Sequence, residues 1–253
     1  MKNPIKVGLF GAGKAGQAVA RVLHGDPRFD LRWVARRLAD ADSVQIQDAT
    51  IPVLSTQRHD LDAWLDAHPV DALVDFSSAE SLALYAPHVA ARGLTLLSAV
   101  SAYPSEAQAQ FEALGQHARV MASPNITLGI NYLLLSAKLL RSIAPFADVE
   151  IMEQHFRDKP EVSGTAKRIA ESLGVTPDRI TAMRLGGIVG HHEVLFGFPY
   201  QTVRLVHDAI GREAFGTGAA YALSLLVQQP PGNYRFDRLL QAQMLAALQS
   251  DTV

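Results

Sequence analysis

The chain contains no cysteine, and this absence excludes disulfide bonds, thiolate catalysis and metal sites that need cysteine ligands. It also lacks an excess of either charge: 23 lysine and arginine residues nearly balance 25 aspartate and glutamate residues, which gives a net charge of −2. Proteins that bind nucleic acid usually carry a basic surface, so we expect no nucleic-acid partner. No apolar run approaches the roughly 20 residues that span a bilayer, so we expect no membrane partner.

What the sequence does contain is typical of a globular enzyme. The chain has 253 residues, of which 48% are hydrophobic, and this is enough to form one large or two modest cores. The first residues lead directly into an apolar strand pattern rather than a signal peptide. We therefore expect a cytoplasmic protein.

Short apolar runs alternate with helical patterns in the first half of the chain. The expected strands are 5–10, 31–35, 71–76, 94–98 and 119–122, and the expected helices include 15–23, 79–92 and 106–117. This alternation predicts βαβ units and a Rossmann-type parallel sheet. After residue 125 a long helix (128–144) precedes strand patterns at 149–155, 180–185, 193–198 and 201–207. Few helices separate them, which predicts a second, α+β domain with a mixed, mostly antiparallel sheet.

A glycine-rich motif follows the first expected strand and opens the first expected helix. It consists of Gly11, Ala12, Gly13, Lys14, Ala15 and Gly16. Glycines at this spacing permit a tight turn, close approach of the backbone to a pyrophosphate and close packing of helix on strand. The alternative is a glycine-rich turn without a ligand, but the strand-turn-helix context favours a dinucleotide site.

The end of the second strand indicates which dinucleotide is bound. An NAD site usually has an acidic residue there to hold the ribose 2′-hydroxyl. This chain has Arg36 and Arg37 instead, and arginine suits the 2′-phosphate of NADPH. A solvated pair of charges is the plainer alternative. We expect NADPH as the cofactor, with NADH possible.

Polar and aromatic residues follow the later strands of the same sheet. In open α/β sheets the ligand lies beyond the carboxyl ends of the strands, so these residues are candidate cofactor contacts. Ordinary turn chemistry is the alternative explanation for each of them. The candidates are Phe76, Ser77, Ser98, Ser101, Ser123 and Asn125.

The segment 153–166 combines a proton donor, a cation and a helix start. His155 ends an apolar strand, and Lys159 follows four residues later. Ser163, Gly164 and Thr165 then open a helix, whose first backbone N–H groups favour a bound anion. His155 and Lys159 are therefore candidate catalytic residues, and the three residues at the helix start are candidate substrate ligands.

Two further features lie downstream of this segment. Arg212 opens a later helix and could pair with a substrate carboxylate. The adjacent pair His191 and His192 invites a metal interpretation, but neighbouring residues on a strand point to opposite faces. No cluster of cysteines or carboxylates accompanies the pair, so we expect no metal site.

These residues together resemble the 4-hydroxy-tetrahydrodipicolinate reductase family, also called the dihydrodipicolinate reductase family. The strongest match is Glu153-x-His155-x-x-x-Lys159 followed by Ser163-Gly164-Thr165-Ala166, and weaker matches extend over nearly the whole chain. The resemblance implies that the C-terminal segment returns to the nucleotide domain. The expected dinucleotide-binding domain is then 1–126 plus 213–253, and the domain for substrate binding and oligomerisation is 127–212.

The resemblance also implies an activity. NADPH would reduce a cyclic imine dicarboxylate in diaminopimelate and lysine biosynthesis, with His155 or Lys159 supplying the proton and a homotetramer as the assembly. Some positions depart from the family pattern: Ser98-Ala99-Val100-Ser101 replaces Gly-Thr-Thr-Gly, Phe156 replaces a histidine, and the glycine loop and the Lys159–Ser163 spacing are each one residue shorter. A paralogue that reduces another imine or keto acid, or a non-catalytic NADPH-binding sensor, therefore remain alternatives.

Overall fold

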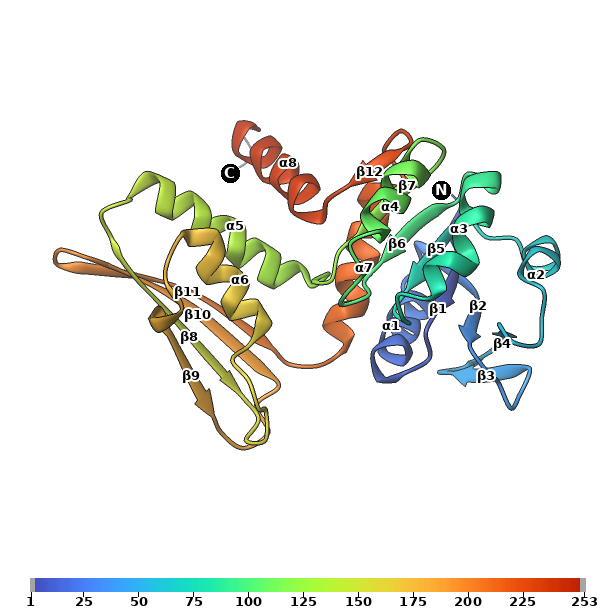
Figure 1. The fold of residues 1–253 in the computed structure, drawn as a ribbon, viewed down its shortest axis with the longest axis horizontal. Helices are drawn as coiled ribbons and strands as arrows, with labels where there is room; N and C mark the ends of the chain where they lie inside the picture. Colours follow the sequence, from blue (N-terminus) through green and yellow to red (C-terminus); the bar gives the residue numbers. More distant parts are fainter. Residues whose placement is uncertain (1–2, 251–253) are drawn as a thin grey trace. The chain divides into compact units, whose positions relative to one another are not determined.

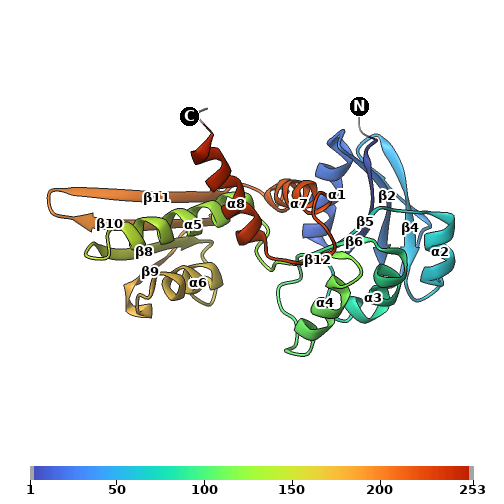
Figure 2. The ribbon, with the colours of Figure 1, turned by 90° about the horizontal axis from the view of Figure 1, so that it is seen from above.

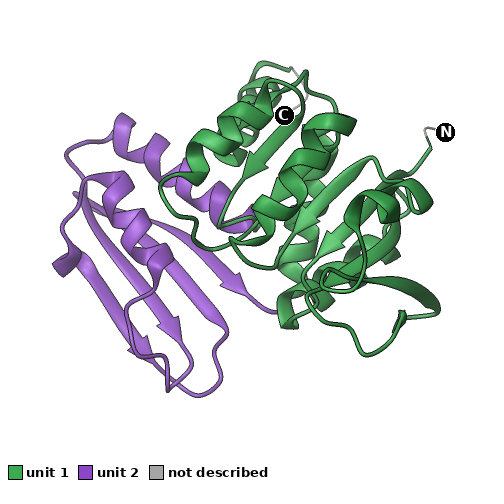
Figure 3. Ribbon diagram, turned by 45° about the vertical axis from the view of Figure 1, so that its right-hand side comes forward, with its two compact units in different colours: residues 1–127, 212–253 green, residues 128–211 purple. Residues whose placement is uncertain are grey.

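The fold was obtained as a computed structural model that describes residues 3–250 (Figure 1). The chain divides into two compact units (Figure 3). Unit 1 comprises Met1–Thr127 and Arg212–Val253, and unit 2 comprises Leu128–Gly211. Thr127 and Arg212 thus belong to unit 1, whereas the sequence interpretation assigned both to the second domain.

Unit 1 is built on an eight-stranded sheet with the order β12-β7-β6-β5-β1-β2-β4-β3. The pairs are parallel except for the antiparallel hairpin of β3 and β4. The strands are β1 (Ile5–Phe10), β2 (Phe29–Arg36), β3 (Ser43–Ile46), β4 (Ala49–Ser55), β5 (Ala72–Asp75), β6 (Thr95–Ser98), β7 (Arg119–Ala122) and β12 (Gly232–Tyr234). The predicted Rossmann-type sheet is confirmed.

Helices cover both faces of this sheet (Figure 2). On one face α1 (Lys14–Gly25) packs against α7 (Glu213–Leu226), and on the other lie α3 (Ser81–Arg92) and α4 (Ala107–Gly115). The remaining helices of the unit are α2 (Leu61–Ala67) and α8 (Phe236–Gln249). The contact between α1 and α7 needs a glycine, because a Cβ on Gly216 would lie 2.6 Å from Val22.

The core of unit 1 contains aromatic side chains that pack edge to face. The ring of Phe10 lies 5.7 Å from that of Trp33 and 5.1 Å from that of Tyr85, measured between centroids. Trp33 is fully buried against β1, where a Cβ on Gly8 would lie 2.2 Å from the indole. A glycine in this strand therefore makes room for the largest core side chain.

The sequence interpretation missed β3, β4 and α2. The two strands form a hairpin whose turn places Gln47 at a φ of 51°, a left-handed conformation that non-glycine residues adopt uncommonly. Pro52 lies within β4 and has no backbone N–H to donate. These features weaken the strand signal of 43–55, although the hairpin completes one edge of the sheet.

Unit 2 is a four-stranded sheet with the order β11-β10-β8-β9, covered on one face by two helices. The pair of β8 (Asp148–His155) and β9 (Ile180–Arg184) is parallel, and β10 (Gly190–Phe198) and β11 (Gln201–Ala209) add antiparallel pairs. The expected mixed sheet is confirmed. The covering helices are α5 (Leu128–Ile143) and α6 (Gly164–Leu173), and a short 3₁₀ turn, η1 (Pro177–Arg179), precedes β9.

Alternation along β8 gives this sheet a buried and a more accessible face. Val149, Ile151, Glu153 and His155 are buried, and the residues between them are only half-buried. The first two join the apolar core with α5 and α6, whereas the last two carry polar groups into the buried layer. Within residues 3–250 no helix combines the length and apolarity needed to cross a membrane.

Candidate functional site

The glycine loop between β1 and α1 has the geometry that its sequence predicts. Gly11 has a φ of +102°, and a Cβ there would lie 2.5 Å from the carbonyl oxygen of Phe76. A Cβ on Gly16 would lie 2.0 Å from the carbonyl oxygen of Gly11. Gly13, the N-cap of α1, has open space where its Cβ would be. The loop therefore has no room for a side chain at Gly11 or Gly16, but it is open at Gly13, beside the N-terminus of α1. Backbone N–H groups at a helix N-terminus attract anions.

A cavity of about 740 Å³ lies beside this loop, and we call it the glycine-loop cavity. It collects residues from the ends of β1, β2 and β5, where open α/β sheets bind ligands. Among the residues that line it are Gly11, Ala12, Gly13, Arg36, Arg37, Phe76, Ser77 and Glu80. Many of the predicted cofactor contacts thus share one cavity, and its two arginines outnumber its one carboxylate.

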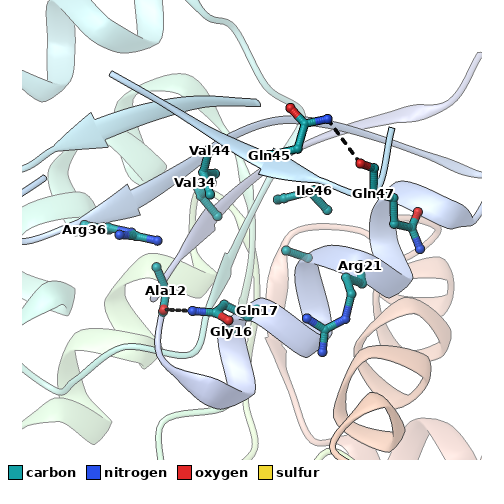
Figure 4. A pocket seen from close by; sticks show the side chains of 11 residues that line it. Ala12, Gly16, Gln17, Arg21, Val34, Arg36, Val44, Gln45, Ile46 and Gln47 are labelled. Carbon is teal, nitrogen blue, oxygen red and sulfur yellow. Dashed lines mark hydrogen bonds between the residues drawn. The ribbon is translucent and has the colours of Figure 1, made fainter. Parts of the chain in front are cut away.

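Arg36 also lines a second, smaller cavity of about 290 Å³ beside α1 (Figure 4). Ala12 and Arg36 lie at one end of this cavity, and Arg21 and Gln47 lie at the other. Arg21 is paired with Glu213 at 2.9 Å, whereas the buried Nε of Arg36 has no hydrogen-bond partner among the described residues. Arg36 thus lines both cavities at the end of β2.

Ser77 and Ser98 belong to a buried polar network around Asp75. The carboxylate of Asp75 accepts hydrogen bonds from Ser77 Oγ at 2.5 Å and from Tyr85 at 2.7 Å. Burial raises the pKa of Asp75, and the hydrogen bonds from Ser77 and Tyr85 only partly oppose this. Ser98 Oγ lies 2.7 Å from the hydroxyl of Tyr103, which in turn lies 3.4 Å from the hydroxyl of Tyr85.

The other predicted cofactor contacts follow β6 and β7. Ser101 is exposed in the loop after β6, whereas Ser98 is fully buried and its hydroxyl has a protein partner. After β7, Ser123 Oγ donates to the carbonyl oxygen of Asn125 at 2.8 Å, and Asn125 Oδ1 accepts from Thr127 at 3.1 Å. These residues follow the carboxyl ends of β6 and β7, and the glycine-loop cavity lies at the carboxyl ends of β1, β2 and β5. They do not line the cavity.

In unit 2 the segment Ser163–Thr165, which the sequence predicts to bind an anion and which we call the cradle, lies at the start of α6. Ser163 is the N-cap, and its Oγ accepts a hydrogen bond from the Thr165 N–H at 3.2 Å. The space where a Cβ of Gly164 would lie is open. The sequence Ser-Gly-Thr therefore caps the helix and leaves room for a ligand at its positive end.

His155 is held next to this cradle by a residue that the sequence analysis did not assign. The fully buried carboxylate of Glu153 lies 2.5 Å from His155 Nδ1 and accepts the Ser163 N–H at 3.1 Å. Arg184 donates to both oxygens of Glu153, at 2.8 and 3.0 Å. Burial raises the pKa of Glu153, but the hydrogen bonds outweigh burial and hold that pKa at about 2.

His192 completes this buried cluster. Its Nε2 lies 2.9 Å from Ser163 Oγ, and its ring stands edge to face against that of His155 at 5.3 Å. Burial, and then the nearby imidazoles of His155 and His207, lower the pKa of His192 to about 4. The ring is therefore neutral at neutral pH. Its location on the buried face agrees with the opposite faces expected for His191 and His192.

Lys159 and Arg212 lie outside the buried cluster of Glu153, His155 and His192. Lys159 is half-buried in the turn after β8, and its carbonyl oxygen accepts a hydrogen bond from Arg184 Nε at 3.0 Å. Arg212 is the exposed N-cap of α7 and belongs to unit 1. Unit 2 therefore holds His155 next to the start of α6, and Arg184 fixes the backbone of Lys159 in the turn between them. Arg212 does not belong to this unit.

Comparison with known proteins relates both units to one family. The family model "Dihydrodipicolinate reductase, N-terminus" matches residues 5–126, and the model "Dihydrodipicolinate reductase, C-terminus" matches residues 129–240. The 4-hydroxy-tetrahydrodipicolinate reductase of Myxococcus xanthus is 32% identical over 232 residues, which cover 80% of this chain and 86% of the relative. The enzyme of that name from Caldanaerobacter subterraneus is 28% identical, covering 90% of this chain and 95% of the relative.

Solved structures support the fold. Dihydrodipicolinate reductase from Paenisporosarcina sp. TG-14, solved with dipicolinate bound, has a TM-score of 0.78 with 20% identity. The match covers 92% of this chain and 97% of that chain. This match shows the fold, whereas the family models and the Myxococcus xanthus relative show that this chain belongs to the dihydrodipicolinate reductase family and is an NAD(P)H-dependent oxidoreductase.

Proposed function

We propose that this protein uses NADPH to reduce 4-hydroxy-tetrahydrodipicolinate, the compound after which its curated relatives are named, in diaminopimelate and lysine biosynthesis. The observation that carries this proposal is the start of α6, with His155 held beside it by Glu153 and Lys159 in the turn that precedes it. A helix N-terminus next to a cation suits a carboxylate, and the Paenisporosarcina neighbour was solved with a dicarboxylate bound.

The proposed substrate contacts follow from charge and position. The first turn of α6 has N–H groups without intrahelical acceptors, of which the Ser163 N–H donates to Glu153 and the Thr165 N–H to Ser163 Oγ. We therefore propose that the segment Ser163–Thr165 binds a substrate carboxylate through the Gly164 N–H and the Thr165 hydroxyl. Lys159 adds a positive charge from the preceding turn, and we propose Arg212 for the second carboxylate. These groups orient the ring and neutralise its charge, which is the principal contribution of a protein to cofactor chemistry.

The proposed chemistry divides between the cofactor and this chain. NADPH held by the glycine loop, Arg36 and Arg37 would supply a hydride to the conjugated C=C–C=N system that remains after the substrate loses water. We propose that His155 or Lys159 donates the accompanying proton to the ring nitrogen. His155 is buried and hydrogen-bonded through Nδ1, so Nε2 is the nitrogen available for this transfer.

The preference for NADPH rests on the end of β2. Arg36 and Arg37 both line the glycine-loop cavity, and the Nε of Arg36 has no hydrogen-bond partner within residues 3–250. Glu80 also lines this cavity and would oppose a phosphate, but the two arginines leave a net positive charge. We therefore propose that NADPH binds more tightly than NADH, with Phe76 and Ser77 beside the adenosine half and Ser98, Ser101, Ser123 and Asn125 toward the nicotinamide.

We also propose that unit 1 binds the cofactor and that unit 2 binds the substrate and mediates assembly into a homotetramer, as the family resemblance implies. Exposed apolar side chains on unit 2, including Ile143 at 68% and Phe146 at 74%, support an assembly role. Light scattering coupled to size-exclusion chromatography would test it: a mass near four chains is expected, and a monomer would contradict it.

A coupled assay tests the proposed reaction. The substrate is generated in situ by its synthase, and oxidation of NADPH or NADH is followed with the purified protein. We expect turnover on the order of 10 per second with NADPH and a lower kcat/KM with NADH. Absence of oxidation in a protein that still binds NADPH would contradict the proposal.

A paralogue acting on a different cyclic imine is the second candidate. It is favoured by Phe156, which is 45% exposed directly after His155 where the family commonly has histidine. Growth of a strain that lacks the pathway reductase discriminates between the two. Rescue by this chain is expected for the pathway enzyme, whereas failure of rescue together with activity on another imine would identify the paralogue.

A further inference from the structure

One buried carboxylate connects the proton-bearing histidine to the anion cradle. Glu153 is fully buried, and each of its oxygens is close to two hydrogen-bonding groups. Oε1 accepts the Ser163 N–H at 3.1 Å and Arg184 Nη2 at 2.8 Å. Oε2 accepts Arg184 Nη1 at 3.0 Å and lies 2.5 Å from His155 Nδ1. The carboxylate thus joins β8, β9 and the start of α6.

The fold accounts for this convergence. Glu153 and His155 are two residues apart on β8 and so lie on the same, buried face. The parallel register of β8 and β9 pairs His155 with Arg184, which brings the guanidinium alongside the carboxylate. Arg184 also donates to the carbonyl oxygens of Lys159 at 3.0 Å and Glu161 at 2.8 Å, and so holds the turn that carries Lys159.

The hydrogen bonds of Glu153 determine the role of each nitrogen of His155. An ionised carboxylate only accepts hydrogen bonds, and Arg184, which cannot release a proton, keeps this one ionised. His155 Nδ1 must therefore be the donor and carry a proton, which leaves Nε2 as the nitrogen that gains and loses one. A Cβ on Gly190 would lie 3.2 Å from Nε2, so the glycine keeps space beside that atom.

We propose that Glu153, supported by Arg184, is a positioning residue that fixes His155 as the Nδ1–H tautomer and holds its Nε2 at a set distance from the α6 cradle. The Glu153 carboxylate binds both His155 and the start of α6. A substrate whose carboxylate lies in the cradle therefore presents its ring to His155 Nε2 in one orientation. This inference rests on the proposed function for the identity of the proton donor, but the tautomer is a property of the protein alone.

Nitrogen NMR of the wild-type protein labelled with ¹⁵N-histidine tests the tautomer without turnover. At a pH where the His155 ring is neutral, we expect Nδ1 to bear the proton and Nε2 to have the shift of an unprotonated nitrogen. The resonance is assigned with His155→Gln. The opposite tautomer, or an even mixture of the two, would overturn the proposal whether or not the protein reduces the proposed substrate.

Glu153→Gln tests the consequence for catalysis. The amide can donate as well as accept, so we expect His155 to lose its single tautomer and kcat to fall about tenfold to a hundredfold. The dissociation constant of NADPH should not change. Glu150→Gln is the matched control, because Glu150 lies on the other face of β8 and bonds to Thr181. Unchanged kcat and an unchanged tautomer in Glu153→Gln would overturn the proposal, and the wild-type spectrum decides alone if that variant does not fold.

Discussion

The candidate cofactor site in unit 1 and the candidate substrate site in unit 2 are built in different ways. In unit 1 the glycine loop offers backbone N–H groups and open space, and the Arg36 Nε has no hydrogen-bond partner among the described residues. In unit 2 buried side chains bond to one another: Glu153 is bonded to His155, Ser163 and Arg184. His192 Nε2 lies next to Ser163 Oγ, although the buried Nδ1 of His192 has no hydrogen-bond partner among the described residues. The site in unit 1 depends on glycines, which have no side chain to fill the loop. The site in unit 2 depends on side chains that hold one another in place through hydrogen bonds.

This difference indicates that the two sites suit different tasks, cofactor binding in unit 1 and proton transfer in unit 2. A dinucleotide needs a smooth backbone surface and a few cations, which the glycine loop and the end of β2 provide. Proton transfer needs one side chain in one orientation. Buried hydrogen bonds fix that orientation, but they require several polar groups that match one another. Changes in the Glu153–His155 network of unit 2 should therefore alter turnover, and changes in the glycine loop or at the end of β2 should alter cofactor affinity.

The largest effect is expected for Lys159→Ala. Loss of the cation beside the cradle, and of a candidate proton donor, should lower kcat by about a hundredfold while the dissociation constant of NADPH stays the same. Lys167→Ala is the control, because Lys167 is an exposed lysine on α6 with only a 3.8 Å ion pair to Glu161. A similar kcat for wild type and Lys159→Ala would contradict the role of Lys159. Weaker NADPH binding by the variant would contradict the claim that residues of unit 2 do not affect cofactor affinity.

The buried network of unit 2 should make stability depend on pH. Because the pKa of His192 is lowered to about 4, the unfolded state binds a proton below its ordinary pKa of about 6.5 while the folded state does not. Stability is therefore lost as the pH falls from about 6.5 toward 4, and between pH 7 and 5 this contribution to the free energy of unfolding falls by about 2 kcal/mol.

Urea unfolding of wild type and His192→Asn at both pH values measures this contribution. The wild type should lose about 2 kcal/mol more than the variant, because asparagine does not titrate. Equal losses in the two proteins would show that His192 is not a buried neutral histidine, and the account of the unit 2 network would then be wrong.

A smaller effect is expected at the end of β2 in unit 1. Arg36→Ala and Arg37→Ala should each weaken NADPH binding by about tenfold, the usual size for one hydrogen bond to a charged group, with NADH binding unchanged. Arg32→Ala is the control, because Arg32 lies earlier on the same strand and pairs with Asp30. Equal loss of NADH and NADPH affinity would show that these arginines do not read the 2′-phosphate.

Much of unit 1 could be predicted because its features are local. The spacing of Gly11, Gly13 and Gly16 between a strand and a helix encodes the turn directly, and the structure shows why a Cβ does not fit at Gly11 or Gly16. The start of α6 was predictable for the same reason, since Ser163 caps its own helix. The hairpin of β3 and β4 was missed because β3 is short and β4 contains a proline.

The network in unit 2 could be predicted only in part. The spacing of Glu153 and His155 along a strand places both on one face, and this local signal could have identified Glu153 as a partner. Arg184 is 31 residues further along, and only the register of β8 with β9 brings it to the carboxylate. His192 meets Ser163 from a third strand. Contacts of this kind depend on tertiary structure, for which a single sequence contains no spacing rule.

The most direct test of the proposed reaction is to follow the hydride itself. Purified protein is given NADPH with deuterium at both C4 positions of the nicotinamide, together with substrate made in situ by its synthase, and the product is analysed by mass spectrometry. We predict tetrahydrodipicolinate with one deuterium on carbon for each NADPH oxidised. Bound cofactor with no labelled product would contradict the assignment of this chain as the reductase of that imine.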